Sequence, residues 1–378
     1  MATEKLPRFD LPEVNFLTVD TATVEAGIIA GYERAAKRTL AQGDPIRLFL
    51  LSVAAEICGL RAEVNIAAQN NLLSYASGDY LDSLGAYFGV TRLAAVPAKG
   101  TFRFTLSTAL ADDVRIPAGT EVTNGTVSFA TDEDAVILAG TLAVTVDATC
   151  TEPGTAGNGY TAGQIGTMVE PIAYVAEAVN ITATQDGADI ETDEALAKRV
   201  QLAPNSFSSA GPRRAYVYHA YSASPAIIDV SVDSPDPGIV NVYLLTTSGQ
   251  LPSQALCSDV LDVLNGEDVR PLTDEVHVYP PEAVVFAVVL DYWISVSDQS
   301  RVAEIQQAVT TAVEQYRQWQ CLHIGRDIVP DKLVQLVIDA GAFRVDQSTL
   351  SPDYEPVSAT QVAVCSGIVL TYKGLTNE

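Results

Sequence analysis

The chain has 378 residues, 48% of them hydrophobic, which is too long for one ordinary core and predicts two to four folded domains instead of a disordered chain. The net charge is −25, and the acidic excess lies beyond residue 100: residues 101–200 hold 15 acidic and 4 basic side chains, against 11 and 9 in residues 1–100. Such a surface repels polyanions, which excludes nucleic acid as a partner; the charge either keeps the monomer soluble or attracts basic partner surfaces.

The first quarter of the chain is predicted to be an extended arm followed by helices. Residues 1–20 contain prolines and show no periodicity, which indicates an extended arm. Residues 21–97 are expected to form a helical region. Within it, Gly43, Asp44 and Pro45 end one helix and start the next, with Asp44 as the N-cap and Pro45 in the first helical position.

The clearest periodic signal in the chain follows this start. Apolar residues recur in alternating steps of four and three along a helix expected over residues 45–76, which would be about 48 Å long. The positions are Ile46, Leu50, Val53, Ile57, Leu60, Val64 and Ala67. This heptad seam is longer than a small domain can cover, so we predict a partner interface in an intermolecular helical bundle. The alternative is a helical hairpin packed on residues 21–41 and 79–89 of the same chain.

Residues 98–185 are predicted to form a compact β-rich domain. Short Thr- and Val-rich runs with an alternating pattern are separated by glycine, proline and asparagine turns. Asn124 and Gly125 form one such turn and are a strong hairpin signal.

The second half of the chain mixes helices and strands. Residues 186–225 are predicted to be a helical connector. Residues 226–346 run strand, strand, helix, strand, strand, helix, which indicates α+β sandwich domains with antiparallel sheets. Residues 347–378 are expected to contain a strand pair, over residues 358–372, and a tail. The predicted fold class is therefore multidomain α+β: an N-terminal helical bundle segment, a central β-rich domain and C-terminal α+β sandwiches.

The sequence carries few signs of chemistry. His219, His277 and His323 lack the spacing of a zinc site, and no phosphate-binding loop or nucleophile elbow is present. We therefore predict no catalytic residue, no cofactor and no metal. Two distant carboxylates could still meet in space as a glycosidase pair, but the sequence singles out none.

An acidic run precedes the connector helix and could suggest calcium. Its members are Asp186, Asp189, Glu191, Asp193 and Glu194. Their order does not fit an EF-hand loop, whereas acidic residues at a helix N-terminus complement the helix dipole. The sequence therefore favours a structural role for this run.

The cysteines and the N-terminus bear on the compartment. The five cysteines are an odd number without close pairs, which favours free thiols in a reducing compartment. No run reaches 18 apolar residues, so no membrane span is expected. The N-terminus lacks the apolar stretch of a secretory signal. We expect a protein that acts where it is made or that leaves by cell lysis.

Several segments, taken in order, resemble the baseplate J-like family of contractile tails. They are GDYLDSLGAYFGVTRLAA (78–95), IPAGTEV (116–122), GTAGNGY (154–160), QDGADIETDEALAKRV (185–200) and AGPRRAYVYHAYSASPAIIDVSV (210–232). Each motif alone is weak, but their order and spacing are specific, and the resemblance extends over residues 15–346. One departure is Asp186 with Gly187, where the family frequently has two glycines.

The resemblance implies a structural wedge subunit of a baseplate in a phage, tailocin or related injection machine. Such proteins assemble with a second, baseplate I-like wedge protein and with further copies of themselves, and they neighbour sheath-initiator and hub proteins. Their N-terminal helices share a bundle, which is where the heptad seam lies, and their C-terminal domains pair between neighbours, which makes residues 226–346 dimerisation-type domains. The ring around the hub widens on firing and relays the trigger to the sheath.

Two other function classes remain as alternatives. An envelope-glycan hydrolase would lose turnover when one or two acids are neutralised, and a glycan-binding adhesin would bind as a lone chain. The predicted location is the baseplate of a virion or injection particle, assembled in the bacterial cytoplasm.

Overall fold

The computed structural model divides into two compact units. The described residues are 8–207, 212–247, 251–266 and 269–377. The first unit combines Met1–Arg92 with Thr192–Pro204, and the second combines Leu93–Glu191 with Asn205–Glu378. Residues 1–7 of the predicted arm lie outside the described part.

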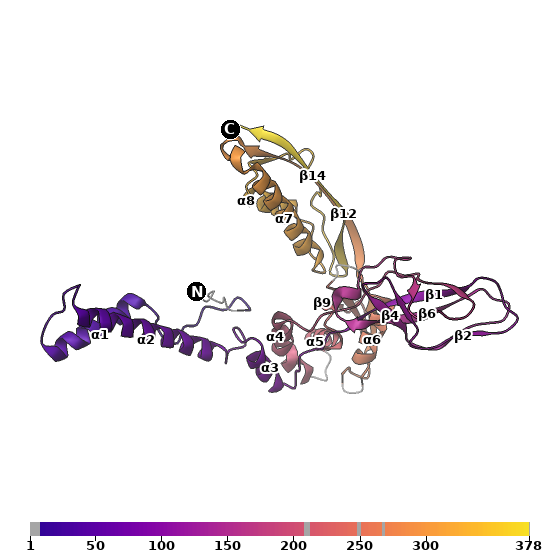
Figure 1. The fold of residues 1–378 in the computed structure, drawn as a ribbon, viewed down its shortest axis with the longest axis horizontal. Coiled ribbons are helices and arrows are strands. Elements are labelled where there is room, and N and C mark those ends of the chain that lie inside the picture. The colour runs from indigo at the N-terminus through magenta and orange to yellow at the C-terminus, as the bar shows by residue number, and fades with distance from the viewer. Residues whose placement is uncertain (1–7, 208–211, 248–250, 267–268, 378) are drawn as a thin grey trace. The chain divides into compact units, whose positions relative to one another are not determined.

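The first unit is helical. Its helices are α1 (Thr21–Ala36), α2 (Pro45–Gln69), α3 (Asp79–Ala86) and α4 (Asp193–Leu202). Helices α1 and α2 run side by side (Figure 1). As predicted, Asp44 caps α2, its side chain accepting a hydrogen bond from Ile46 N at 2.9 Å, and Pro45 occupies the first helical position.

Helix α2 ends at Gln69, earlier than the expected residue 76. The next residues, Asn70 and Asn71, are poor helix formers, and the Asn71 amide donates to the carbonyl of Ala67 at 2.9 Å. A side chain thus satisfies an end carbonyl of the helix. The 25 residues of α2 span about 37 Å instead of the 48 Å expected.

The second unit begins with the β domain. Its strands are β1 (Pro97–Leu106), β2 (Val114–Ile116), β3 (Glu121–Thr123), β4 (Ser128–Thr131), β5 (Ala135–Ile137), β6 (Ala143–Pro153), β7 (Thr167–Met168) and β8 (Val175–Asn180), with the short 3-10 helix η1 (Thr155–Gly157) after β6. Six strands form a sheet in the order β7-β3-β4-β6-β1-β8, every neighbouring pair antiparallel, and β2 pairs with β5.

The alternating pattern of the β strands places aromatic residues inside this domain. Phe102, Phe104 and Phe129 are fully buried, and the rings of Phe102 and Phe129 lie 5.4 Å apart. The predicted hairpin turn joins β3 to β4: Asn124 Oδ1 accepts two backbone N–H groups, and Gly125 has a φ of 90° that favours glycine. The prediction of a β-rich domain is confirmed.

Helices and two small sheets complete the second unit. The 3-10 helix η2 (Ala203–Phe207) leads into it. The first sheet contains β9 (Ile227–Asp233), β10 (Ile239–Thr246) and β11 (Glu275–Tyr279), together with α5 (Arg213–Ala223) and α6 (Gln254–Leu264). The second contains β12 (Glu282–Ser295), β13 (Arg344–Val345) and β14 (Gln361–Thr376), together with η3 (Val296–Arg301), α7 (Val302–Cys321) and α8 (Pro330–Asp339).

The multidomain α+β class is confirmed, but the two C-terminal sheets are mixed. Strand β10 pairs antiparallel with β9 and parallel with β11, and β12 pairs antiparallel with β13 and parallel with β14. Helices separate the strands of each parallel pair in sequence, which gives the chain the crossover that a parallel pair requires. An alternating pattern reveals which residues face the core but not the direction of the neighbouring strand.

The expected strand pair over residues 358–372 is one long strand instead. β14 pairs with β12 along nearly its whole length and belongs to the same sheet, so residues 347–378 are not a separate piece. Ser366 and Gly367 form a bulge: Phe286 pairs with Cys365 and Val288 with Ile368, which leaves one extra residue on β14. Ser366 and Gly367, which in the sequence suggest a turn between two strands, thus lie within one strand.

Candidate partner interface

Helix α2 is covered on one side by its own chain. Ala54 and Cys58 of α2 are buried against Val24 of α1, and Ile28 and Ile57 pack at the edge of this cluster. Of the predicted alternative, a helical hairpin packed on residues 21–41 and 79–89, the contact with residues 21–41 is therefore present. It occupies one face of the helix.

The N-terminal arm continues this cover along the second half of α2. The buried Asn65 side chain accepts hydrogen bonds from the backbone N–H groups of Phe16 (3.0 Å) and Leu17 (2.7 Å) and donates to the carbonyl of Leu17 (2.8 Å). Gln69 donates to the carbonyl of Val14 at 2.8 Å. A carboxamide carries a donor and an acceptor like a peptide group, so it pairs with an extended chain. Residues 11–20 contain no helix or strand, and the arm predicted over residues 1–20 stays a prediction.

The arm leaves apolar side chains in solvent. Five of its residues are large, apolar and exposed: Leu11, Val14, Phe16, Leu17 and Val19. Backbone groups of Val14, Phe16 and Leu17 are hydrogen-bonded to α2 while their side chains remain exposed. Clusters of exposed apolar side chains of this kind mark interaction surfaces.

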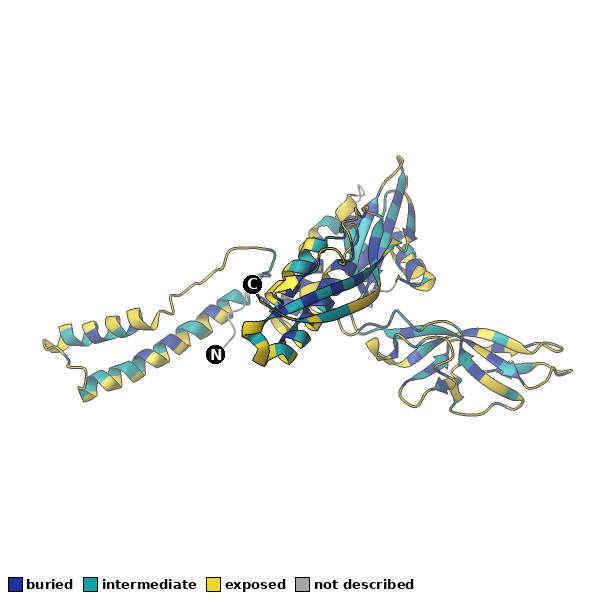
Figure 2. Ribbon diagram, turned by 90° about the horizontal axis from the view of Figure 1, so that it is seen from above, coloured by how far each residue is buried: buried dark blue, intermediate teal, exposed yellow. Residues whose placement is uncertain are grey.

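The seven seam residues lie on a different face of α2 from the covered one. An α-helix turns about 100° per residue, so the positions from Ile46 to Ala67 fall in a stripe about 100° wide. This stripe is centred about 110° from the line through Ala54, Cys58 and Asn65. The chain's own α1 and arm therefore pack mainly beside the heptad seam and reach it at Ile57. Figure 2 shows many exposed residues along this helix pair.

Burial along the seam decreases toward its C-terminal end. Leu60 is 60% exposed, and Val64 and Ala67 are exposed as well. The four earlier positions are half-buried: Ile46, Leu50, Val53 and Ile57. Phe49, which borders the seam, is also exposed. The seam is thus an apolar stripe that this chain covers incompletely.

Sequence reasoning missed Asn65 and the role of the arm. An asparagine inside a helix is unfavourable by intrinsic propensity, and its occurrence within an apolar helix was the available signal. The arm itself carried no periodic signal that could identify where it binds.

Arg92 connects the first unit's distant segments. Its guanidinium donates to Asp82 at 2.7 Å and to Asp193 at 2.8 Å, and the hydrogen bond to Asp82 is the main cause that raises the pKa of Arg92. Asp193 and Glu194 lie in the first turn of α4, behind the N-cap Thr192. These contacts support the predicted structural role of the acidic run.

The three histidines have structural surroundings. Burial lowers the pKa of His219, His277 stacks on Tyr279 with ring centroids 5.9 Å apart, and His323 Nδ1 lies 3.2 Å from Asp229. Among the residues that the structure describes, no three His, Cys, Asp or Glu side chains gather as a metal site. Within the same residues, no helix is long and apolar enough to cross a bilayer.

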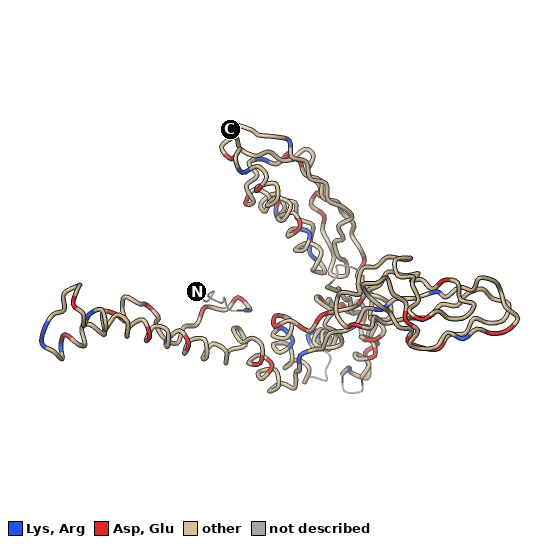
Figure 3. The backbone as a smooth tube through the Cα atoms, in the orientation of Figure 1, with Lys and Arg blue, Asp and Glu red and all other residues tan. Residues whose placement is uncertain are grey.

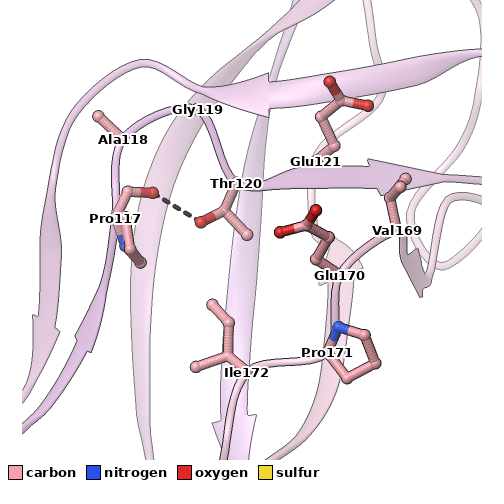
Figure 4. Close-up of a pocket in the computed structure, with 9 residues that line it drawn as sticks. All are labelled: Pro117, Ala118, Gly119, Thr120, Glu121, Val169, Glu170, Pro171 and Ile172. Atoms are coloured by element: carbon pink, nitrogen blue, oxygen red, sulfur yellow. Dashed lines mark hydrogen bonds between the residues drawn. The ribbon is translucent and has the colours of Figure 1, made fainter.

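A hollow of about 410 Å³ in the β domain brings two carboxylates to one wall (Figure 4). It lies between residues 117–121 and 169–172 and includes Glu121 and Glu170. Both glutamates are exposed. A glycosidase needs a general acid that keeps its proton near neutral pH, usually through burial. The hollow does not offer that environment to either carboxylate.

Comparison with known proteins identifies the family. Sequence models of three domains match in order: the baseplate J-like N-terminal domain at residues 42–99, the barrel domain at 101–187 and the central domain at 208–280. Baseplate protein J of Escherichia phage P2 is 29% identical over 181 residues, which are 47% of this chain and 58% of the P2 protein. The match therefore spans less than two thirds of that relative's length.

A solved baseplate also resembles the chain at low similarity. In the cryo-EM structure of the anti-feeding prophage baseplate, one chain is 14% identical, with 91% of this chain and 90% of that chain covered. Its TM-score of 0.37 is too low to support an argument. The three domain models together cover more than half of the sequence, in the order that the motifs predicted. The chain therefore belongs to the baseplate J-like protein family.

Proposed function

We propose that this protein is a non-enzymatic wedge subunit in the baseplate of a contractile tail or injection machine. It would assemble with a second, baseplate I-like wedge protein and with further copies of itself into a ring around the hub. The observation that carries this proposal is the incompletely covered seam on α2. Relay of the firing trigger to the sheath, and contacts with sheath-initiator and hub proteins, belong to the same proposal.

The proposal depends on the free energy that a complex would gain by burying the exposed apolar side chains of the seam. Fully burying one Leu, Ile or Val side chain stabilises a complex by roughly 1.5–3 kcal/mol. Leu60 and Val64 are exposed, and four further seam positions are half-buried, so a partner helix would add several such increments. The heptad spacing matches the knobs-into-holes packing of neighbouring helices. An intermolecular bundle thus fits both the spacing and the exposure of these residues.

The test compares two leucines on the same helix. Leu60, on the seam, is 60% exposed, and Leu48, about 120° away around the helix, is 58% exposed. Leu60→Asp should abolish co-purification with the second wedge protein because it puts a charge into the proposed bundle. Leu48→Asp changes the same residue type at the same exposure and should leave the complex intact.

Native mass measurement of the co-expressed proteins gives the readout, and circular dichroism checks that each variant stays helical. Retention of the complex by Leu60→Asp would refute the bundle. Equal loss in both variants would also refute it, because the contact would then not follow the seam.

A further inference from the structure

One end of the β domain carries exposed apolar side chains that its own fold does not use. Leu138 is 60% exposed, Leu142 is 52% exposed and Tyr174 is 67% exposed. Val136 on β5 is also exposed, whereas its neighbour Ile137, the last residue of that strand, is fully buried. We call Val136, Leu138, Leu142 and Tyr174 the barrel-end patch.

Backbone hydrogen bonds bring together patch residues from two loops, the one between β5 and β6 and the one before β8. Leu142 and Tyr174 flank the end of β1, because Leu106 N donates to the carbonyl of Leu142 (2.8 Å) and Ser107 N donates to that of Tyr174 (3.4 Å). Thr141 N donates to the carbonyl of Leu138 at 2.9 Å, which turns that residue back toward Leu142. The patch is therefore a local feature of one sheet end and not a set of scattered residues.

Tyr174 has an unfavourable backbone conformation at its position in the patch. Its φ is 71°, in the left-handed region that favours glycine and that a bulky aromatic residue seldom adopts. Burial of the ring does not compensate for this strain, since the side chain is mostly exposed. A strained backbone that presents an exposed aromatic ring suggests a function for that ring.

The charges around the patch indicate what could cover it. The loops and strands of residues 107–142 and 169–178 contain eight acidic residues and one basic residue, Arg115, which is ion-paired with Asp134. Asp112 and Glu177 are exposed near the patch, and Asp113 Oδ1 accepts the N–H of Ala139 beside it. Figure 3 shows the predominance of acidic positions along this domain. A second copy of the domain would be repelled, whereas a basic surface would be attracted.

We propose that the barrel-end patch docks a different protein of the same baseplate, through a surface that is apolar at its centre and rich in Lys and Arg at its rim. Tyr174 is the central anchor, and the surrounding carboxylates give the contact its charge preference. This inference rests on the proposed baseplate function but concerns a surface separate from the α2 seam.

The first experiment places a photo-crosslinking amino acid, benzoylphenylalanine, at position 174 of the full-length chain. Position 272, where Leu272 is fully exposed outside the patch, receives the same residue as a control. Tail particles are assembled from the gene cluster that encodes the chain, irradiated and analysed by mass spectrometry. Position 174 should crosslink to one other tail protein, at a surface rich in Lys and Arg, and position 272 should not.

Binding of that purified tail protein to the full-length chain then tests the anchor. Tyr174→Gly should raise the dissociation constant about 30-fold, because aromatic anchors contribute much of the binding energy of an interface. Its melting temperature should stay within a few degrees of the parent's, because glycine adopts this φ without strain. Leu272→Gly should change neither quantity. Raising the salt concentration from 0.1 to 0.5 M should weaken the parent's binding about tenfold.

The outcomes separate this inference from the proposed function. Absence of the chain from purified particles would refute the proposed function itself. Three outcomes would refute the docking patch alone. The chain could be incorporated with no more crosslinking at position 174 than at position 272, position 174 could crosslink to a second copy of the chain, or Tyr174→Gly could bind as well as the parent.

Discussion

Single residues determine how the N-terminal arm is fixed. Asn65 lies inside α2, where asparagine is a poor helix former, yet it is buried and bonded to both Phe16 and Leu17 of the arm. An apolar residue at this position would favour the helix but leave the arm's peptide groups without a partner. Asn65 therefore lowers the helix propensity of α2 but fixes the arm through its hydrogen bonds.

Asn65→Ala should release the arm without unfolding α2. Loss of the partner of a partly buried N–H costs about 1–3 kcal/mol, so hydrogen exchange at the Phe16 and Leu17 amides should become at least about tenfold faster. Asn71→Ala is the control, since the Asn71 amide bonds the helix carbonyl of Ala67 and should leave exchange in the arm unchanged. Equal protection of Leu17 in the parent and in Asn65→Ala would contradict this account.

Among the elements, α2 has two apolar faces with different surroundings. Its Ala54, Cys58 and Asn65 side faces its own chain, and its heptad seam is covered incompletely. Gly59 lies on neither line, about 100° from Leu60, and an added Cβ there would meet no atom within 4 Å. A glycine in a helix interior costs up to about 1 kcal/mol relative to alanine.

Gly59→Ala should therefore stabilise the helical unit by up to about 1 kcal/mol, measured as a rise in the denaturant midpoint followed by circular dichroism. Gly27→Ala in α1, where added atoms also meet open space, should behave in the same way. Assembly with the second wedge protein should be unaffected by Gly59→Ala if the partner lies on the seam. Loss of assembly would mean that a partner backbone approaches Gly59 instead.

At the scale of the whole molecule, the helical unit is built from two separate parts of the sequence. Helix α4 returns to it after the β domain, and Leu196 and Val200 of α4 are buried. Arg92 bonds both Asp82 and Asp193 and so joins these two parts. The unit should not be complete when the chain is cut before the β domain.

A fragment of residues 1–92 should be less stable than the same fragment linked to residues 192–204. Burial of Leu196 and Val200 should contribute about 1.5–3 kcal/mol each, which would appear as a higher denaturation midpoint and as slower proteolysis within α3. Leu196→Asp in the linked fragment should remove the gain. Identical midpoints for the two fragments would show that α4 is not needed for this unit.

Local signals in the sequence were sufficient for many elements. Asp44 with Pro45 predicted the start of α2, and Asn124 with Gly125 predicted the hairpin, because a cap or a turn depends on a few adjacent residues. The end of α2 and the single strand β14 were mispredicted. In both cases a tertiary or side-chain contact decided between structures that the local pattern allowed.

The order of motifs along the chain determined the family by itself, and the alternation of apolar residues determined the multidomain α+β class. Tertiary structure alone decided which face of α2 the chain covers, that α4 rejoins the first helices, and that β14 runs parallel to β12. The reason is physical. Periodicity shows which face of a helix or strand is apolar, whereas contacts between residues far apart in the sequence determine which neighbour buries that face. Asn65 with Leu17, and Arg92 with Asp193, are such contacts.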